Sequence, residues 1–139
     1  IYAASRAQLV KKLIEPALED GFIILCDRFV DSSLAYQGWA RGLGIERLAD
    51  INGWFLKDTW PDLTIVLDID PALSLKRISG KKDRLEEEGL DFHRRVREGF
   101  LKLKALYPDR IKIVDAAQDS RQVFETILFE LQKSGIINM

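Results

Sequence analysis

The densest group of side chains that could do chemistry lies in residues 27–37. An acid and a base come first, and two hydroxyls, a phenol and an amide follow within about two helical turns. The group comprises Asp27, Arg28, Ser32, Ser33, Tyr36 and Gln37. An arginine in such a group indicates a phosphate or carboxylate ligand, because its planar guanidinium can bind either through two hydrogen bonds. A capped helix with a surface ion pair would explain Asp27 and Arg28 alone, but it does not explain the whole group.

A buried strand is expected immediately before this group. The apolar run at residues 22–26 shows no alternation and is bounded by Gly21, which is typical of a strand covered on both faces in a parallel sheet. Cys26 lies within this run, so we interpret it as a small core residue and not as a nucleophile. A helix is expected over residues 31–40. The group would then lie beyond the carboxyl end of a strand, where open α/β sheets bind ligands.

Strands and helices are expected to alternate along the rest of the chain. Two more buried strands are predicted at residues 63–69 and 111–114. The other predicted helices cover residues 1–20, 45–57, 72–78, 89–106 and 121–133. Pro16 should kink the first helix because it removes a backbone donor. Asp70 should cap the third of these helices, with Pro71 at its first position. This alternation predicts one α/β domain over residues 1–139, with a parallel sheet and helices on both faces.

Composition excludes several classes of protein. The chain has 139 residues, is 47% hydrophobic and carries a formal charge of −1, so nothing global attracts it to a nucleic acid polymer or a membrane. The single cysteine excludes an internal disulfide and fits the reducing cytoplasm. No apolar run is long enough to span a bilayer. His93 is the only histidine, and we interpret it as a surface or half-buried residue and not as a metal ligand.

A second basic region lies between Arg77 and Arg84. Two basic regions over one sheet edge would suit transfer of a phosphoryl group between two phosphate-bearing ligands, a reaction catalysed mainly by positioning and charge stabilisation. The charged run at residues 81–88 has two interpretations that stay open, a solvated surface or a mobile lid over a nucleotide. The apolar stripe of residues 45–57 indicates core or a subunit interface. Its members are Leu48, Ile51, Trp54 and Phe55.

Several motifs resemble those of bacterial thymidylate kinases. Residues 27–38, DRFVDSSLAYQG, resemble the family's signature, and residues 2–6, YAASR, resemble its segment with an aromatic residue four positions before an arginine. Residues 83–86 followed by Phe92 resemble its lid and next helix, and residues 114–116 its last strand and loop. The resemblance covers nearly the whole chain in matching order. It implies a P-loop nucleoside monophosphate kinase-like fold and ATP-dependent phosphorylation of dTMP to dTDP, in dTTP biosynthesis.

The resemblance also implies a dTMP site. Arg28 would hold the 5′-phosphate, and Asp27 would lie beside Mg²⁺ and the reacting phosphates. Arg6 would hydrogen-bond to the thymine edge, and Tyr2 would stack on the base. Tyr36 would lie under the sugar and disfavour a 2′-hydroxyl. The remaining contacts would be Ser32, Ser33 and Gln37 to base and phosphate, and Glu86 to the sugar 3′-hydroxyl.

The resemblance implies a second site for the donor nucleotide, ATP. Arg77 would stack on its adenine. The loop that touches the adenine edge would be Ala116, Ala117 and Gln118. Lid charges at about residues 79–88 would reach the phosphates, and they are Lys81, Lys82 and Arg84. The resemblance further implies a homodimer packed through helices.

One departure from the family affects the expected activity. Its members begin with a strand, a Walker A loop and a Glu-Pro-Gly segment, and none of these precedes residue 1 here. We therefore expect the chain to belong to a longer protein and to be inactive alone. The missing strand would separate residues 22–26 from residues 63–69 by about two strand spacings, near 10 Å, so these two segments should not be hydrogen-bonded to each other.

Two alternatives remain. The chain could belong to a deoxynucleoside kinase of related fold. It could also be a non-catalytic binding or dimerisation module that kept the fold.

Overall fold

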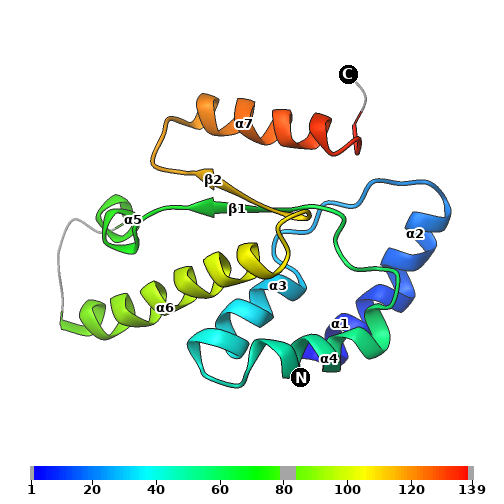
Figure 1. Cartoon of the computed structure of the whole chain (residues 1–139), viewed down its shortest axis with the longest axis horizontal. Coiled ribbons are helices and arrows are strands. Elements are labelled where there is room, and N and C mark those ends of the chain that lie inside the picture. The colour runs from blue at the N-terminus through cyan, green and yellow to red at the C-terminus, as the bar shows by residue number, and fades with distance from the viewer. Residues whose placement is uncertain (1, 79–83, 138–139) are drawn as a thin grey trace.

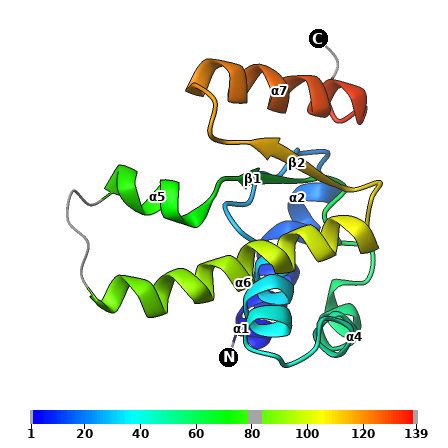
Figure 2. The same cartoon turned by 60° about the vertical axis from the view of Figure 1, so that its left-hand side comes forward.

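The chain folds around a short parallel sheet in the computed structural model. The structure describes residues 2–78 and 84–137, without the side chains of residues 75–78 and 84–88. Strand β1 (Thr64–Asp68) pairs with β2 (Ile111–Asp115), and these are the only strands among the described residues. Figures 1 and 2 both show α7 on one face of this sheet and α6 on the other. The predicted α/β class, with a parallel sheet between helices, is confirmed.

The helices follow the predicted ones closely. They are α1 (Tyr2–Leu9), η1 (Val10–Ile14), α2 (Glu15–Glu19), α3 (Val30–Ser33), η2 (Leu34–Ala40), α4 (Ile45–Leu56), α5 (Pro71–Ile78), α6 (Arg84–Leu106) and α7 (Ser120–Lys133). Asp70 caps α5, because its carboxylate accepts a hydrogen bond from the Ala72 amide at 2.7 Å. Asp119 caps α7 in the same way through Arg121 and Gln122. Helix α6 begins five residues before the predicted position, so part of the predicted lid is helical.

The first predicted helix contains a widened turn at the place where a kink was expected. Helix η1 is π-helical, and the Glu15 amide donates to the carbonyl of Val10, five residues earlier. Pro16 follows directly and lacks a backbone N–H, so an ordinary α-turn here would leave the carbonyl of Lys12 without its donor. Widening the turn by one residue accommodates the proline without ending the helix.

The strand predicted at residues 22–26 is wrong. These residues form no strand, and they are exposed: Phe22 is 65% and Leu25 is 97% accessible. Cys26 is exposed too, so its interpretation as a core residue is also wrong. A strand needs a neighbour to accept and donate its backbone hydrogen bonds, and β1 pairs only with β2 in the described chain. The expectation that this segment does not pair with β1 holds.

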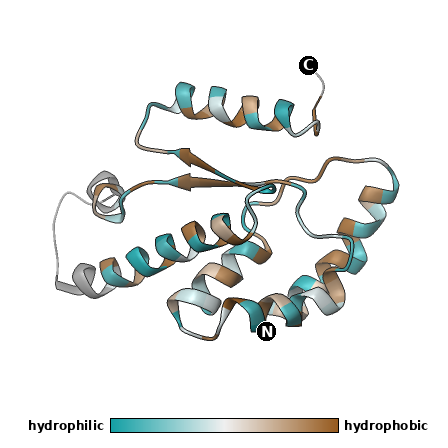
Figure 3. Cartoon of the chain, viewed as in Figure 1, coloured by the Kyte–Doolittle hydropathy of each residue, from teal (hydrophilic) through white to brown (hydrophobic). Residues whose placement is uncertain are grey.

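The core lies where η2, α6 and the sheet meet. Figure 3 shows both strands as hydrophobic, which agrees with helices covering each face of the sheet. The buried cluster comprises Val10, Ile14, Val30, Leu34, Ala35, Leu56, Leu103 and Ile111. Gly99 sets how closely α6 approaches η2, since a Cβ there would lie 3.0 Å from the carbonyl oxygen and 3.1 Å from the Cα of Ala35.

Replacing Gly99 by alanine should therefore destabilise the fold. The added methyl group meets backbone, which cannot rotate away, and we expect a loss of about 1–3 kcal/mol of unfolding free energy. Gly89→Ala is the matched control on the same helix, because nothing lies within 4 Å of its Cβ position. That variant should gain up to about 1 kcal/mol from helix propensity alone. Urea unfolding of the two variants measures the difference, and equal midpoints would contradict the close contact.

Candidate functional site

Arg28 lies at the entrance to α3 in a strained backbone conformation. Its φ is +71°, a left-handed region that residues with a side chain rarely adopt. Its guanidinium lies 4.5 Å from the ring centroid of Tyr36, and its Nε donates to the Ser32 hydroxyl at 3.4 Å. No carboxylate pairs with Arg28 among the described residues. The guanidinium thus stands at the surface, held over an aromatic ring, with its charge available to an anion.

Two other aromatic rings pack against the ring of Tyr36. Phe92 and Phe100 of α6 meet it edge-on, with centroids 6.0 and 6.4 Å away. Edge-to-face pairs of this kind hold ring planes in place. Helix α6 therefore sets the orientation of Tyr36, and Tyr36 supports Arg28. The predicted grouping of these two side chains is found in the structure.

Arg6 connects α1 to the same region. It donates to the Ser33 hydroxyl at 2.6 Å, to the Asn52 side-chain oxygen at 2.6 Å and to the Phe29 carbonyl at 3.5 Å. Burial lowers the pKa of this guanidinium, and the nearby Asp31 carboxylate acts in the opposite direction. All three groups that accept hydrogen bonds from Arg6 are neutral. The positive charge of Arg6 is therefore half-buried next to Phe29 and Ser33.

The other predicted acceptor-side residues are less closely grouped. Ser32 and Ser33 are half-buried and follow Arg28 by four and five residues. Gln37 is also half-buried, one helical turn after Ser33. Asp27 is exposed, next to Arg28 in the chain. Tyr2 is 69% accessible and lies one helical turn from Arg6 on α1. The structure thus brings Arg6, Arg28, Ser32, Ser33 and Tyr36 into one region from α1, α3 and η2.

Sequence reasoning missed Asn52. Its side chain is 2% accessible, accepts from Arg6 and donates to the Leu48 carbonyl at 2.7 Å. A signal was present, because Asn52 follows Leu48 by four residues and precedes Leu56 by four, which places it on the buried face of α4. A polar residue on such a face needs a partner, and here the partner is Arg6.

Sequence reasoning also missed the role of Asp31. The sequence placed it only at the start of a helix, and the structure puts it in the first turn of α3 with its carboxylate bound to distant residues. Arg110 donates to both of its oxygens at 2.7 and 2.8 Å, and the Thr64 hydroxyl donates at 2.7 Å. Asp31 is 3% accessible. The sequence separations of 79 and 33 residues explain why no local pattern revealed the cluster.

A cavity of about 240 Å³ lies at the carboxyl end of β1. Its lining includes Asp68, Ser74, His93 and Arg97. Arg97 binds Asp68 through two hydrogen bonds of 2.7 and 2.8 Å, and this contact raises the pKa of the guanidinium. The pair ties α6 to the end of the strand. This is the edge at which open α/β sheets bind ligands.

The predicted donor side is described only in part. The side chains of Arg77, Lys81, Lys82 and Arg84 lie outside the described residues, as does that of Glu86, which was predicted for the dTMP site. The loop of Ala116, Ala117 and Gln118 directly follows β2, and the Ala116 amide donates to the Asp68 carbonyl at 2.8 Å. This contact places the loop beside the carboxyl end of β1, next to the smaller cavity.

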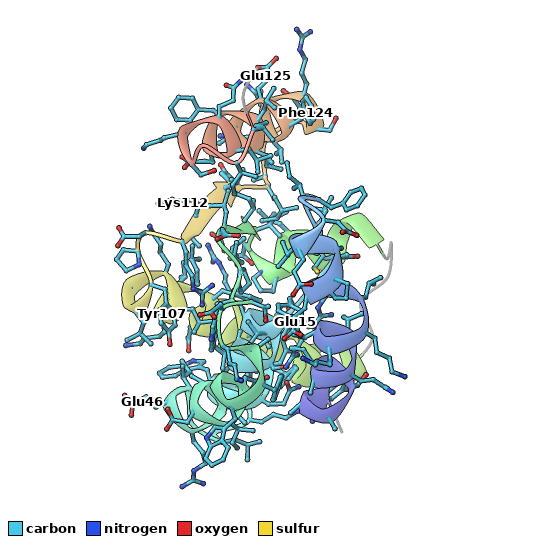
Figure 4. All side chains as sticks on the ribbon, turned by 90° about the vertical axis from the view of Figure 1, so that its right-hand side faces the viewer. Glu15, Glu46, Tyr107, Lys112, Phe124 and Glu125 are labelled. Carbon is cyan, nitrogen blue, oxygen red and sulfur yellow. The ribbon has the colours of Figure 1, made fainter. Side chains whose placement is uncertain are left out.

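A larger cavity, of about 620 Å³, lies away from all predicted site residues. It is lined by Asp50 and Trp54 of α4 together with Trp60, Tyr107 and Arg110. Figure 4 shows Tyr107 and the α4 residue Glu46 on one side of the molecule, away from the blue α1–α2 helix. We take the grouping around Arg28, and not the larger cavity, as the candidate site.

Two searches of the described residues found nothing. No three His, Cys, Asp or Glu side chains in that part of the chain are arranged to hold a metal ion. None of the helices described is both long and apolar enough to cross a membrane.

Comparison with known proteins gives one consistent result. A family model described as thymidylate kinase matches residues 1–127. The chain is 54% identical over 127 residues to a thymidylate kinase of Lactobacillus delbrueckii subsp. bulgaricus, covering 88% of this chain and 60% of that protein. It is 48% identical over 131 residues to one of Clostridium novyi, covering 91% and 64%. It is 49% identical over 137 residues to one of Lactobacillus helveticus, covering 96% and 65%.

The chain therefore spans less than two thirds of the length of each of these three relatives. The match includes the signature at residues 27–38, the Arg6 segment and both strands, because all of them fall within residues 1–127. This chain belongs to the thymidylate kinase family.

Proposed function

We propose that the protein phosphorylates dTMP to dTDP with ATP as donor, and that residues 2–40 supply most of the dTMP site. The observation that carries this proposal is the unpaired guanidinium of Arg28 over Tyr36, with Ser32 beside it. A phosphate monoester would give this charge its missing anion. Arg6, at the far end of the same region, has hydrogen-bonding groups of the kind that a base edge requires.

The reaction needs little covalent chemistry from the protein. A phosphate oxygen of dTMP forms a bond to the γ-phosphorus of ATP while the bond to the β–γ bridging oxygen breaks, and ADP leaves. Two anionic groups must approach each other, so positioning and charge neutralisation dominate catalysis. Arg28 would offset the charge of the attacking phosphate. The loop of residues 116–118 lies at the carboxyl end of the sheet, where open α/β sheets bind ligands, and would contact the donor nucleotide there.

The residues present fit a magnesium ion carried by the nucleotides. Mg²⁺ keeps several waters and is usually bound by one or two carboxylates together with substrate phosphates. Asp27 is an exposed carboxylate next to Arg28 and would be the protein ligand of such an ion. When bound, the ion would neutralise phosphate charge. Asp27 would orient it near Arg28.

Calorimetric titration with dTMP tests the acceptor site directly. The chain should bind dTMP more tightly than thymidine, because Arg28 recognises the phosphate. Equal affinity for the two would contradict the proposal, and tight binding of thymidine would favour a deoxynucleoside kinase. A coupled assay with ATP tests the expectation that these 139 residues, which contain no Gly-Lys-Ser or Gly-Lys-Thr, do not transfer phosphate alone.

Tyr36 should control the choice between deoxyribose and ribose. If its fixed ring lies under the sugar, it leaves no room for a 2′-hydroxyl. We expect Tyr36→Ala to reduce the ratio of specificity constants for dUMP over UMP, measured on the intact protein. Tyr36→Phe is the control, since it keeps the ring and should keep the ratio. An unchanged ratio in Tyr36→Ala would remove this role.

We also propose that the protein is a cytoplasmic homodimer. Leu9 and Leu13 are exposed on the first helix, and Ile51 and Trp54 are exposed on α4, with Trp54 85% accessible. The Arg6–Asn52 hydrogen bond brings these two helices together. Leu48 and Phe55, the other half of the predicted stripe, pack against the core instead. Exposed apolar groups gathered in this way usually mark interfaces.

Sedimentation velocity tests this assembly. Trp54→Glu should move the protein toward monomer, because a charge would replace a large apolar contact. Phe124→Glu on α7, where the wild-type side chain is 62% accessible, should leave the dimer intact. A wild-type protein that sediments as a monomer at every concentration would contradict the proposal.

A further inference from the structure

Both oxygens of the Asp31 carboxylate accept hydrogen bonds from protein groups. One oxygen accepts from Arg110 Nη2 at 2.8 Å, and the other accepts from Arg110 Nη1 and the Thr64 hydroxyl, each at 2.7 Å. The side chains of Asp31 and Arg110 are 4% and 17% accessible. Asp31 is therefore buried against protein groups and not presented to a substrate, although it lies only three residues from Arg28.

Arg110 is itself held in place. Its guanidinium lies 4.6 Å from the ring centroid of Tyr107 and 5.5 Å from that of Trp60. Its carbonyl accepts from the Thr64 amide at 2.8 Å, where β1 begins. The partner of Asp31 is thus a rigid part of the sheet's amino end and not a flexible surface arginine.

The backbone of Arg28 needs support from somewhere, because its left-handed conformation persists only when the surroundings fix it. The residues before it, 22–27, are exposed apart from the half-buried Ile24 and form no helix or strand. The residues after it are buried: Val30 is 0% and Asp31 is 3% accessible. The packing that fixes the Arg28 backbone therefore comes mainly from the residues that follow it, in α3.

We propose that Asp31 is a positioning residue for the acceptor site. It binds the first turn of α3 to the amino end of the sheet through Arg110 and Thr64, and so fixes the backbone that carries Arg28 and Ser32 without touching the substrate. This inference rests on the proposed function for its effect on dTMP. Its structural part, that Asp31 holds residues 28–33, can be tested without any nucleotide.

The test compares Asp31→Asn with a core variant of similar stability. Asp31→Asn keeps the shape and removes the charge that Arg110 binds. Thr64→Val is the milder second variant, because it removes the hydrogen bond to Asp31 and a long one of 3.5 Å from Arg110 but leaves the ion pair. Val114→Ala on β2, where the wild-type residue is 2% accessible, is the control, since it lies four residues after Arg110 and pairs with Leu67, three residues after Thr64. All measurements are made on the intact protein, well below each variant's melting temperature.

Hydrogen exchange is the first readout. In Asp31→Asn, amides of residues 29–33 should exchange on the order of tenfold faster than in Val114→Ala, while those of α7 exchange equally in both. Thr64→Val should show a smaller change at the same amides. Equal exchange of residues 29–33 in Asp31→Asn and Val114→Ala would overturn the positioning role, whatever the protein binds.

Nucleotide affinity is the second readout. Asp31→Asn should weaken dTMP binding on the order of tenfold and leave ATP binding unchanged, because only the acceptor side moves. Val114→Ala should change neither affinity. Suppose the wild type binds dTMP, and Asp31→Asn speeds exchange at residues 29–33 but binds dTMP equally tightly. That result would overturn the functional part of the inference. A wild type that binds no dTMP would instead contradict the proposed function, and exchange would still decide the role of Asp31.

Discussion

Replacing Arg28 with alanine should weaken dTMP binding by a factor of roughly 30 or more, the loss expected when charge-assisted hydrogen bonds to a phosphate are removed. ATP affinity should change little, because Arg28 lies on the acceptor side, over Tyr36 and beside Ser32. Calorimetric titration of the intact protein with each nucleotide measures both effects. If both nucleotides weaken equally, Arg28 does not belong to the acceptor site.

Two further variants separate geometry from charge. Arg28→Lys keeps the positive charge but loses the planar pair of donors, so its dTMP affinity should fall between those of the wild type and Arg28→Ala. Arg121→Ala is the matched control. This arginine is exposed on α7 and binds only Glu125, four residues later, at 3.0 Å. Its loss should leave both affinities unchanged.

The largest effect on stability is expected at Arg110. Arg110→Met keeps a hydrocarbon chain between Trp60 and Tyr107 but leaves the Asp31 carboxylate buried with only the Thr64 hydroxyl. Breaking a buried ion pair from one side typically costs about 3–5 kcal/mol of unfolding free energy, because the remaining charge stays uncompensated. Urea unfolding at fixed protein concentration measures this loss.

The double variant distinguishes a lost contact from a buried charge. In Asp31→Asn with Arg110→Met, no charge remains, so the protein should be more stable than Arg110→Met alone. Arg121→Met, which breaks an exposed pair on α7, should barely change the midpoint. A double variant as unstable as the sum of its two single variants would show that the Asp31–Arg110 pair has no energetic coupling.

Local patterns were enough for the helices and for two strands. Pro71 after Asp70, and Asp119 before the apolar period of α7, are short-range signals that act within one turn, and the structure uses both. The signature around Arg28 was equally local. Its hydroxyls and phenol lie on one continuous helix and its arginine lies just before that helix, so most of the grouping follows from short sequence spacing.

Local patterns failed at residues 22–26, which were predicted to be a buried strand and are mostly exposed. An apolar run has the composition of a strand, but a strand exists only when a neighbour pairs with its backbone, and none of the described residues does so here. The same limit applies to Asp31. Its type predicts a cap or an ion pair, but the choice of Arg110, 79 residues later, depends on how the strands bring distant segments together.

The sequence by itself determined the family and the α/β class, and it predicts anion binding by Arg28, because these depend on residue types at short spacing. Only the tertiary structure decided which groups hold Arg28 in place. Asn52 orients Arg6, Phe92 and Phe100 orient Tyr36, and Asp31 is bound by Arg110 and Thr64. These contacts join different helices and strands. Their physical basis is burial, which obliges each polar group to find a partner wherever the packed chain provides one.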